Sequence, residues 1–502
     1  MENNDDKILK RKTFSGLIWR FSERFLAQIV TFVVSIVLAR LLLPDDYGIV
    51  AIVTVFISLA DVLVTNGLGT ALIQKQEVDD VDFSSIFYCG IVLSAALYLI
   101  IFLTAPLISN IYSNELITPV LRVMGLRIPI AAINSVQQSF VVRNMLFKKF
   151  FFSTLFGTLV SGGVGIGMAV SGLGVWALVG QYLSNTVIDT FVLFVTISWK
   201  PKLVFSFAKC KTLFSYGWKI MLSSFIGVLF NKAKNLVIGA KYTESDLAYY
   251  TKGESFPMLI TTNIESSIDS VVFSTLAKQQ NDLSKVRDTC SKFLGLGSFL
   301  IMPLLIGMAV TADGIIKLLL TDKWLECVPF LQVVCLGQIF SLVSTVNLQA
   351  YKAIGRSDIV LKLEFVKKPI LLGIIIGMMF ISPMAIAIGV AVYELLGALI
   401  NSFMSKRLIG YSVFAQLKEI LPTLIISLVM GVSVYFFKYI PIHYAIILGL
   451  QIISGIVIYI LLSLLFNKKN SKYIVDLIRR KKHKSLASEE EIAKRSDSDI
   501  TE

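Results

Sequence analysis

The sequence predicts an all-α polytopic membrane protein with about fourteen transmembrane helices. Apolar segments of about twenty residues recur along nearly the whole chain, separated by short polar loops, and this length crosses the hydrocarbon core of a bilayer. Of the 502 residues, 55% are hydrophobic and only 16% are charged. A soluble helix of this length would keep a polar face, and an open sheet edge could not satisfy its backbone in lipid. The chain is therefore expected to fold within a membrane.

The expected helices follow one another with short connections. They lie near residues 14–40, 47–74, 83–109, 116–142, 150–171, 174–198, 206–239, 246–277, 286–313, 325–350, 357–381, 383–408, 415–438 and 441–466. The first, seventh and eighth score least well because they carry charged side chains. The charged N-terminus has no small-residue cleavage site, so no secretory signal is expected.

Lysine and arginine are unequally distributed between the two classes of loop. The rich class includes the N-terminus and the loops with Arg143, Lys202, Lys285 and Lys406, whereas the opposite loops hold few basic residues. By the positive-inside rule the rich side is cytoplasmic, which places both termini inside. The net charge of +13 therefore reflects membrane topology. No nucleic-acid module is recognisable, and no nucleic-acid partner is expected.

Weak internal similarity at a spacing of about 200 residues indicates two parallel copies of six helices, related by an axis along the membrane normal. LARLLLPDDYGIV (from Leu38) corresponds to IGAKYTESDLAYY (from Ile238), and QSFVVRNMLFKKF (from Gln138) to QAYKAIGRSDIVL (from Gln349). The predicted organisation is a cytoplasmic N-terminus (1–13), an N-terminal bundle (14–200), a C-terminal bundle (201–410), two extra transmembrane helices (411–466) and a charged cytoplasmic tail (467–502).

Ionisable residues inside the expected helices form stripes, and charged groups at membrane depth usually face a wet cavity or a partner. The basic ones are Arg20, Arg24, Arg127, Lys219, Lys232 and Lys234, the acidic ones include Asp61, Glu265 and Asp269, and further polar groups include Asn134, Gln138, Asn185 and Asp189. One interpretation is a shared central cavity between the two bundles. The alternative is that individual residues form ion pairs that fix packing, as Arg20 could with Glu23.

A cavity with hydroxyl, amide and cationic groups suits a ligand that is both sugar-like and anionic, because arginine and lysine bind phosphate oxygens. We therefore expect substrate to contact Arg20, Arg24, Arg127, Lys219, Lys232 and Lys234. Asp61, Glu265 and Asp269 are candidates for coupling to protons or sodium ions. No other cofactor is expected.

Several classes of chemistry lack their usual residues. His443 and His483 have no partner at ligand spacing, so no metal site is expected. The five cysteines (Cys89, Cys210, Cys290, Cys327 and Cys335) form no CxxC motif and are expected to be small buried side chains. A phosphate-binding GxxxxGK[ST] loop and a soluble catalytic domain are both missing, so the chain is not expected to be an enzyme. Glycines in residues 162–167 are expected to permit close helix packing.

Four segments resemble the Wzx-type polysaccharide transporters, which are flippases of the multidrug/oligosaccharidyl-lipid/polysaccharide exporter superfamily. They are LARLLLPDDYGIV, GLGTALIQ (from Gly67), QSFVVRNMLFKKF and GLGVWALVGQYL (from Gly172). The resemblance implies two six-helix bundles plus two helices, and transfer of undecaprenyl-diphosphate-linked oligosaccharide from the inner to the outer leaflet of a bacterial plasma membrane. It also implies the polymerase and glycosyltransferases of the same pathway as partners. Pro44 and Gly48 are expected to end one helix and permit the next.

Two other functions remain open from the sequence. A multidrug or organic-cation antiporter of the same fold should have a cavity dominated by carboxylates, whereas embedded basic residues here equal or slightly exceed acidic ones. A polysaccharide polymerase would need a sizeable outer loop with catalytic residues, and every expected outer loop is short.

Overall fold

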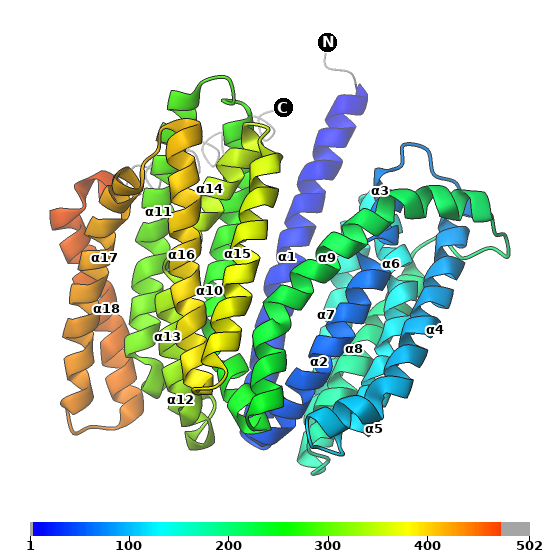
Figure 1. Cartoon of the computed structure of the whole chain (residues 1–502), viewed down its shortest axis with the longest axis horizontal. Helices are drawn as coiled ribbons and strands as arrows, with labels where there is room; N and C mark the ends of the chain where they lie inside the picture. Colours follow the sequence, from blue (N-terminus) through cyan, green and yellow to red (C-terminus); the bar gives the residue numbers. More distant parts are fainter. Residues whose placement is uncertain (1–3, 473–502) are drawn as a thin grey trace, which may run out of the picture. The chain divides into compact units, whose positions relative to one another are not determined.

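The part of the chain that the structure describes is mostly helical. The computed structural model describes residues 4–472, and none of these residues lies in a β-strand. They form two compact units (Figure 1). The first contains the described residues up to Thr251, with Leu319–Glu326 and Ile375–Ile386, and the second contains Lys252–Leu318, Cys327–Ile374 and the described residues from Ala387. The all-α prediction is confirmed.

The first unit is built mainly from nine helices. They are α1 (Asn4–Leu41), α2 (Pro44–Thr65), α3 (Leu68–Gln74), α4 (Asp80–Ile111), α5 (Ile117–Gly125), α6 (Arg127–Arg143), α7 (Phe147–Val170), α8 (Val175–Thr196) and α9 (Phe207–Lys241). The first helix starts ten residues before the expected position, and the segments expected at 47–74 and 116–142 are each divided into two helices. α10 (Glu244–Ala277) begins in this unit and continues in the second.

The second unit contains the remaining helices. They are α11 (Leu283–Val310), α12 (Ala312–Leu319), α13 (Val328–Gln338), α14 (Ser341–Ala353), α15 (Ser357–Met378), α16 (Pro383–Ile409), α17 (Val413–Tyr435) and α18 (Tyr444–Phe466), with short 3₁₀ turns at Asp322–Cys327 and Phe436–Tyr439. The ends of α12 and α15, the start of α16 and all of the first 3₁₀ turn except Cys327 belong to the first unit. The predicted tail lies outside the described residues beyond residue 472.

Eleven helical segments of the described chain are long and apolar enough to cross a membrane. The helix α9 bends by 48° between Phe207–Ser215 and Gly217–Lys241 and is a twelfth if its two parts are counted as one span. All fourteen expected segments are helical, but α10 and α15 are too polar to pass the same test of length and composition. The chain is therefore a multi-pass membrane protein. Its described residues contain eleven or twelve clear spans, which is roughly consistent with the expected fourteen but does not confirm that number.

The two similar turns that suggested a duplication share a local geometry. The backbone N–H of Leu43 donates to Asp46 Oδ2 at the start of α2, and the N–H of Thr243 donates to Asp246 Oδ2 at the start of α10, each at 3.1 Å. These carboxylates satisfy N–H groups that helix termini leave free. The two compact units reflect helix packing and not sequence duplication, so they do not test the predicted boundaries of the two six-helix bundles. Those boundaries remain a prediction.

Gly48 has a different role from the one expected. Pro44 does occupy the first turn of α2, but Gly48 lies inside that helix. A Cβ atom at Gly48 would overlap the backbone carbonyl of Glu244, at the start of α10. Glycine is therefore needed for the close approach of the two helices and does not form the turn. Similarly, a Cβ at Gly162 would contact Val34 of α1, whereas Gly163 faces open space.

Helix packing in the first unit places α2, α6 and α8 beside one another (Figure 1). α6 contacts α2, α4 and α8, and α8 also packs along α7. At the end of the unit near α3, an apolar cluster holds Leu72, Phe83, Trp199 and Leu213 together. The polar side chains of α2, α6 and α8 consequently meet inside the unit.

Candidate functional site: a polar cavity in the first unit

A half-open cavity of about 400 Å³ lies among α2, α3, α6 and α8. Most of its lining residues are polar, although the helices around it belong to the membrane-spanning set. The lining includes the predicted Asp61 and Arg127, with Asn134, Gln138, Asn185 and Asp189. This space has the size of an ordinary ligand pocket but lacks the usual apolar walls.

At one level of the cavity, Asp61 of α2 and Arg127 of α6 form an ion pair. Arg127 Nη2 lies 3.4 Å from Asp61 Oδ2, and the side chains are 30% and 14% exposed, respectively. Arg127 Nε also donates to Thr186 Oγ1 of α8 at 3.1 Å. The charge of Arg127 is therefore already compensated within the unit, as the packing alternative allowed.

About one helical turn further along α8, an amide and a carboxylate meet. The Nδ2 group of Asn134 donates to Asp189 Oδ2 at 2.8 Å and to Thr190 Oγ1 at 3.0 Å. Because both amide protons are used, the orientation of this amide is fixed and its oxygen faces away from these partners. Asn134 is 95% buried, since its exposed fraction is 5%.

Three buried oxygen atoms at the cavity have no hydrogen-bond partner within residues 4–472. Among the described residues, Asp61 Oδ1, Asn134 Oδ1 and Asp189 Oδ1 are buried and accept no hydrogen bond. Ser153 and Gln138 are further hydrogen-bonding neighbours of the Asp189 carboxylate. Buried acceptors normally have partners, so these oxygens can accept hydrogen bonds from donors that enter the cavity.

The two predicted substrate-binding arginines of α1 differ: Arg20 forms an ion pair, and Arg24 is exposed. Arg20 Nη1 donates to Glu23 Oε2 at 3.2 Å, and the guanidinium lies 4.3 Å from the ring centre of Phe150. Glu23 is also close enough to Asp189 for their charges to interact. Arg24, one turn further along, is exposed.

The predicted lysines of α9 differ in exposure. Lys219 is exposed, whereas Lys232 and Lys234 are half-buried. Lys234 Nζ lies 5.3 Å from the ring centre of Tyr250 in the first turns of α10. None of these three lysines lines the polar cavity.

The predicted acidic residues of α10 lie in the second unit. Glu265 accepts a hydrogen bond of 2.5 Å from Ser341 Oγ of α14. Asp269 and Glu394 are close enough to interact electrostatically with Glu265. Within residues 4–472, no group of three or more His, Cys, Asp or Glu side chains is arranged to hold a metal ion.

The loop between α3 and α4 is held by charged contacts. Arg143 donates to the backbone carbonyls of Leu72, Lys75 and Gln76 at 3.0, 2.6 and 2.6 Å, which satisfies the end of α3. Asp79, which caps α4, accepts a hydrogen bond from Lys209 of α9. This hydrogen bond is the main reason that the pKa of Asp79 falls to about 2.

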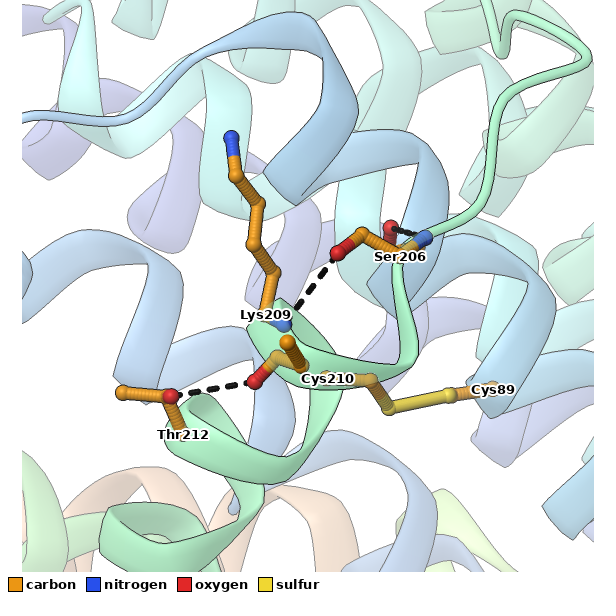
Figure 2. Close-up of a disulfide and its surroundings, with 7 residues drawn as sticks. Cys89, Ser206, Lys209, Cys210 and Thr212 are labelled. Atoms are coloured by element: carbon orange, nitrogen blue, oxygen red, sulfur yellow. Dashed lines mark hydrogen bonds between the residues drawn. A yellow bond between two sulfur atoms is a disulfide. The ribbon is translucent and has the colours of Figure 1, made fainter.

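The expectation for the cysteines is partly wrong. Cys89 of α4 and Cys210 of α9 are joined by a disulfide (Figure 2), and only Cys290, Cys327 and Cys335 are free and buried as expected. The two joined cysteines are 121 positions apart in the sequence, so no local motif indicates their pairing. Ser206, the N-cap of α9, lies beside them (Figure 2).

Prediction from the sequence identified fewer than half of the residues that line the cavity. It named Asn134, Gln138, Asn185 and Asp189 only as further polar groups, and it missed Thr186 and Thr190. Their spacing of four on α8 was a usable signal, because it places both hydroxyls on the helix face that carries Asp189. The structure thus combines one predicted acid and one predicted base with amides and hydroxyls.

These features define a polytopic membrane protein with a polar cavity among its membrane-spanning helices. The model of the polysaccharide biosynthesis protein family matches residues 37–329, more than half of the chain. The chain belongs to this family, and the resemblance seen in its sequence is confirmed.

Named relatives and a solved structure agree with this assignment. The lipopolysaccharide biosynthesis protein WzxC of Escherichia coli (strain K12) is 24% identical over 84% of this chain and 88% of its own length. The teichuronic acid biosynthesis protein TuaB of Bacillus subtilis (strain 168) is 24% identical over 60% of this chain and 62% of its own. The lipid II flippase MurJ has a similar fold, with a TM-score of 0.73 at 17% identity over 92% of this chain and 100% of that chain.

Proposed function

We propose that this protein is a flippase for lipid-linked oligosaccharides in the synthesis of a cell-surface polysaccharide. It would move a polyprenyl-diphosphate-linked repeat unit from the inner to the outer leaflet by alternating access. Membership of the polysaccharide biosynthesis family, the MurJ-like fold and the relatives WzxC and TuaB support this proposal. The charge distribution of the loops supports a plasma-membrane location with both termini in the cytoplasm.

The observation that carries the proposal is the polar cavity within a membrane-spanning unit. A sugar hydroxyl placed in hydrocarbon without a partner costs several kcal/mol, on the order of 4–8 by alkane-transfer scales. A head group with many hydroxyls therefore needs a route with polar walls. The cavity at Asp61, Arg127, Asn134 and Asp189 supplies such walls.

The diphosphate needs cations, and the structure favours some candidates over others. Arg24 and Lys219 are exposed, whereas Arg20 and Arg127 already contact carboxylates of their own unit. We therefore assign the diphosphate first to Arg24 and Lys219, with Lys232 and Lys234 as further contacts. The polyprenyl tail would stay in the lipid.

The energy source would be the membrane potential, a coupled ion or both. Moving a negative charge out of a negative-inside cell is favourable by about 2.3 kcal/mol per charge per 100 mV. Asp61, Glu265 and Asp269 remain the proposed sites for a coupled proton or sodium ion. No catalytic step is needed, so we propose transport rather than an enzyme activity.

The proposal is tested by the leaflet distribution of the lipid-linked repeat unit. Cells without this protein should accumulate the lipid-linked repeat unit on the inner face of the membrane, and expression of the wild-type gene in these cells should clear it. A variant with Arg24→Ala and Lys219→Ala should clear it more slowly, whereas Asp288→Asn, which alters an exposed carboxylate near the start of α11, should act as wild type. An unchanged distribution in cells lacking the protein would overturn the proposal.

A further inference from the structure

We propose that the polar cavity of the first unit is a sugar subsite that accepts neutral or amino sugars and rejects acidic sugars. This inference rests on the proposed function, because it assigns one part of the transported head group to one part of the protein. Three properties of the cavity support it: its size, its charge and its three unpartnered acceptor oxygens.

The cavity is large enough for one or two sugar rings and not for a whole repeat unit. Its volume of about 400 Å³ lies near the lower end of the range for ligand pockets. It is half-open, so a sugar could enter while the rest of the head group stays outside. Its polar walls would replace the water around ring hydroxyls during passage through the membrane.

The charged groups at the cavity leave one negative charge in excess. Its lining contains two carboxylates, Asp61 and Asp189, and one guanidinium, Arg127. The ion pair between Asp61 and Arg127 cancels one carboxylate, so the charge of Asp189 remains. On the neighbouring α1, Glu23 interacts with Asp189, but it is paired with Arg20 and also interacts with Arg24, so that helix adds no net negative charge. A carboxylate on the ligand would therefore be repelled.

The unpartnered oxygens of the cavity also favour a sugar without a carboxylate. Asp61 Oδ1, Asn134 Oδ1 and Asp189 Oδ1 can each accept a hydrogen bond, and Asn134 cannot rotate its amide without breaking two hydrogen bonds. Hydroxyl and ammonium groups are donors, whereas a carboxylate can only accept. The cavity is thus complementary to a donor-rich sugar, and Asp189 is its main determinant of specificity.

The test compares three methyl glycosides with the same ring: the glucoside, the 2-amino-2-deoxyglucoside and the glucuronoside. The full chain in lipid nanodiscs is titrated with each by saturation-transfer NMR, at ligand concentrations on the order of the millimolar Kd expected for a single sugar. We expect the first two to bind and the glucuronoside to bind at least about tenfold more weakly. Asp189→Asn should remove most of this difference, and Asp61→Asn should also strengthen glucuronoside binding by freeing Arg127. Asp288→Asn is the matched control and should change none of the three affinities.

The outcomes separate this proposal from the proposed function. Glucuronoside binding as strong as glucoside binding, or discrimination that survives Asp189→Asn, would overturn the subsite. A chain that clears the lipid-linked intermediate in cells but binds none of the glycosides would also overturn it and leave the flippase proposal standing. Glycoside discrimination by a chain that does not change the leaflet distribution would support the subsite and count against flipping.

Discussion

The ion pair between Asp61 and Arg127 predicts a large coupling free energy between these two residues. At 3.4 Å and an effective dielectric constant of about 20, the attraction is roughly 5 kcal/mol. The cavity is half-open and Arg127 is 30% exposed, so solvent reduces this value. We expect a coupling of about 2 kcal/mol, within the range measured for close charge pairs.

A double-mutant cycle with Asp61→Asn, Arg127→Met and the double variant measures this coupling through thermal unfolding of the purified protein. Each single variant should lower the Tm by on the order of 4 °C if a unit of this size unfolds together. The double variant should lose much less than the sum. The exposed pair of Lys202 and Asp80, whose atoms are 2.5 Å apart with side chains 63% and 50% exposed, is the matched control.

The control should show a coupling below about 1 kcal/mol despite its shorter distance, because exposed pairs are screened by solvent. Additive effects at Asp61 and Arg127, within about 0.5 kcal/mol, would show that the two charges are independent. Arg127 would then be free to hold a phosphate, and the reasoning for a cavity with one excess negative charge would fail.

Three further predictions concern the frame around the cavity. Gly48→Ala should destabilise the protein by about 1–3 kcal/mol because its methyl group would overlap the Glu244 carbonyl. Gly163 faces open space, so Gly163→Ala should change the stability by less than about 1 kcal/mol. Unfolding of both variants measures this difference, and equal effects would contradict the close approach of α2 and α10. Because Lys209 lowers the pKa of Asp79 to about 2, the stability advantage of wild type over Asp79→Asn should be complete above about pH 4 and disappear as the pH falls through about 2; a difference that does not vary over this window would refute the assignment. Under oxidising purification, thiol labelling of the unfolded chain should find three reactive cysteines, and five after reduction, because Cys89 and Cys210 are joined; five without reduction would disprove the bond.

The helices could be predicted well from the sequence because a segment that crosses the membrane must be apolar along its whole length. The length of about twenty residues needed to cross a bilayer is visible without any knowledge of packing. Breaks inside a span are less visible: the division of α2 from α3 at Asn66-Gly67 depends on tertiary contacts, since a Cβ at Gly67 would overlap Met221 of α9. The high polarity of α10 likewise shows why the count of clear spans is smaller than the count of long helices.

The site was predictable only in part because a helical stripe shows which residues share a face and not what that face contacts. Asp61 and Arg127 were recognised as ionisable residues at membrane depth, but their mutual pairing joins α2 to α6 and has no sequence signature. Asn134 appears as one more polar residue in the sequence. Only its hydrogen bonds to Asp189 and Thr190 distinguish it as a fixed part of the cavity.

The disulfide illustrates the same limit. Cys89 and Cys210 come together because the start of α9 is fastened to α4 by several contacts. These include the N–H of Ser206, which donates to Ser85 Oγ at 2.9 Å, and the ion pair between Lys209 and Asp79. The approach of the two cysteines therefore depends on the packing of α4 against α9, which the sequence alone does not show.

The most direct test of the account is transport by the purified protein in sealed vesicles. A polyprenyl-diphosphate-linked oligosaccharide is incorporated in both leaflets, and an impermeant reagent that modifies the sugar is added outside. Vesicles with the wild-type chain should allow the reagent to reach nearly all of the lipid over time, at a rate reduced by Arg24→Ala with Lys219→Ala. Modification confined to the lipid of the outer leaflet, as in vesicles without protein, would contradict the account.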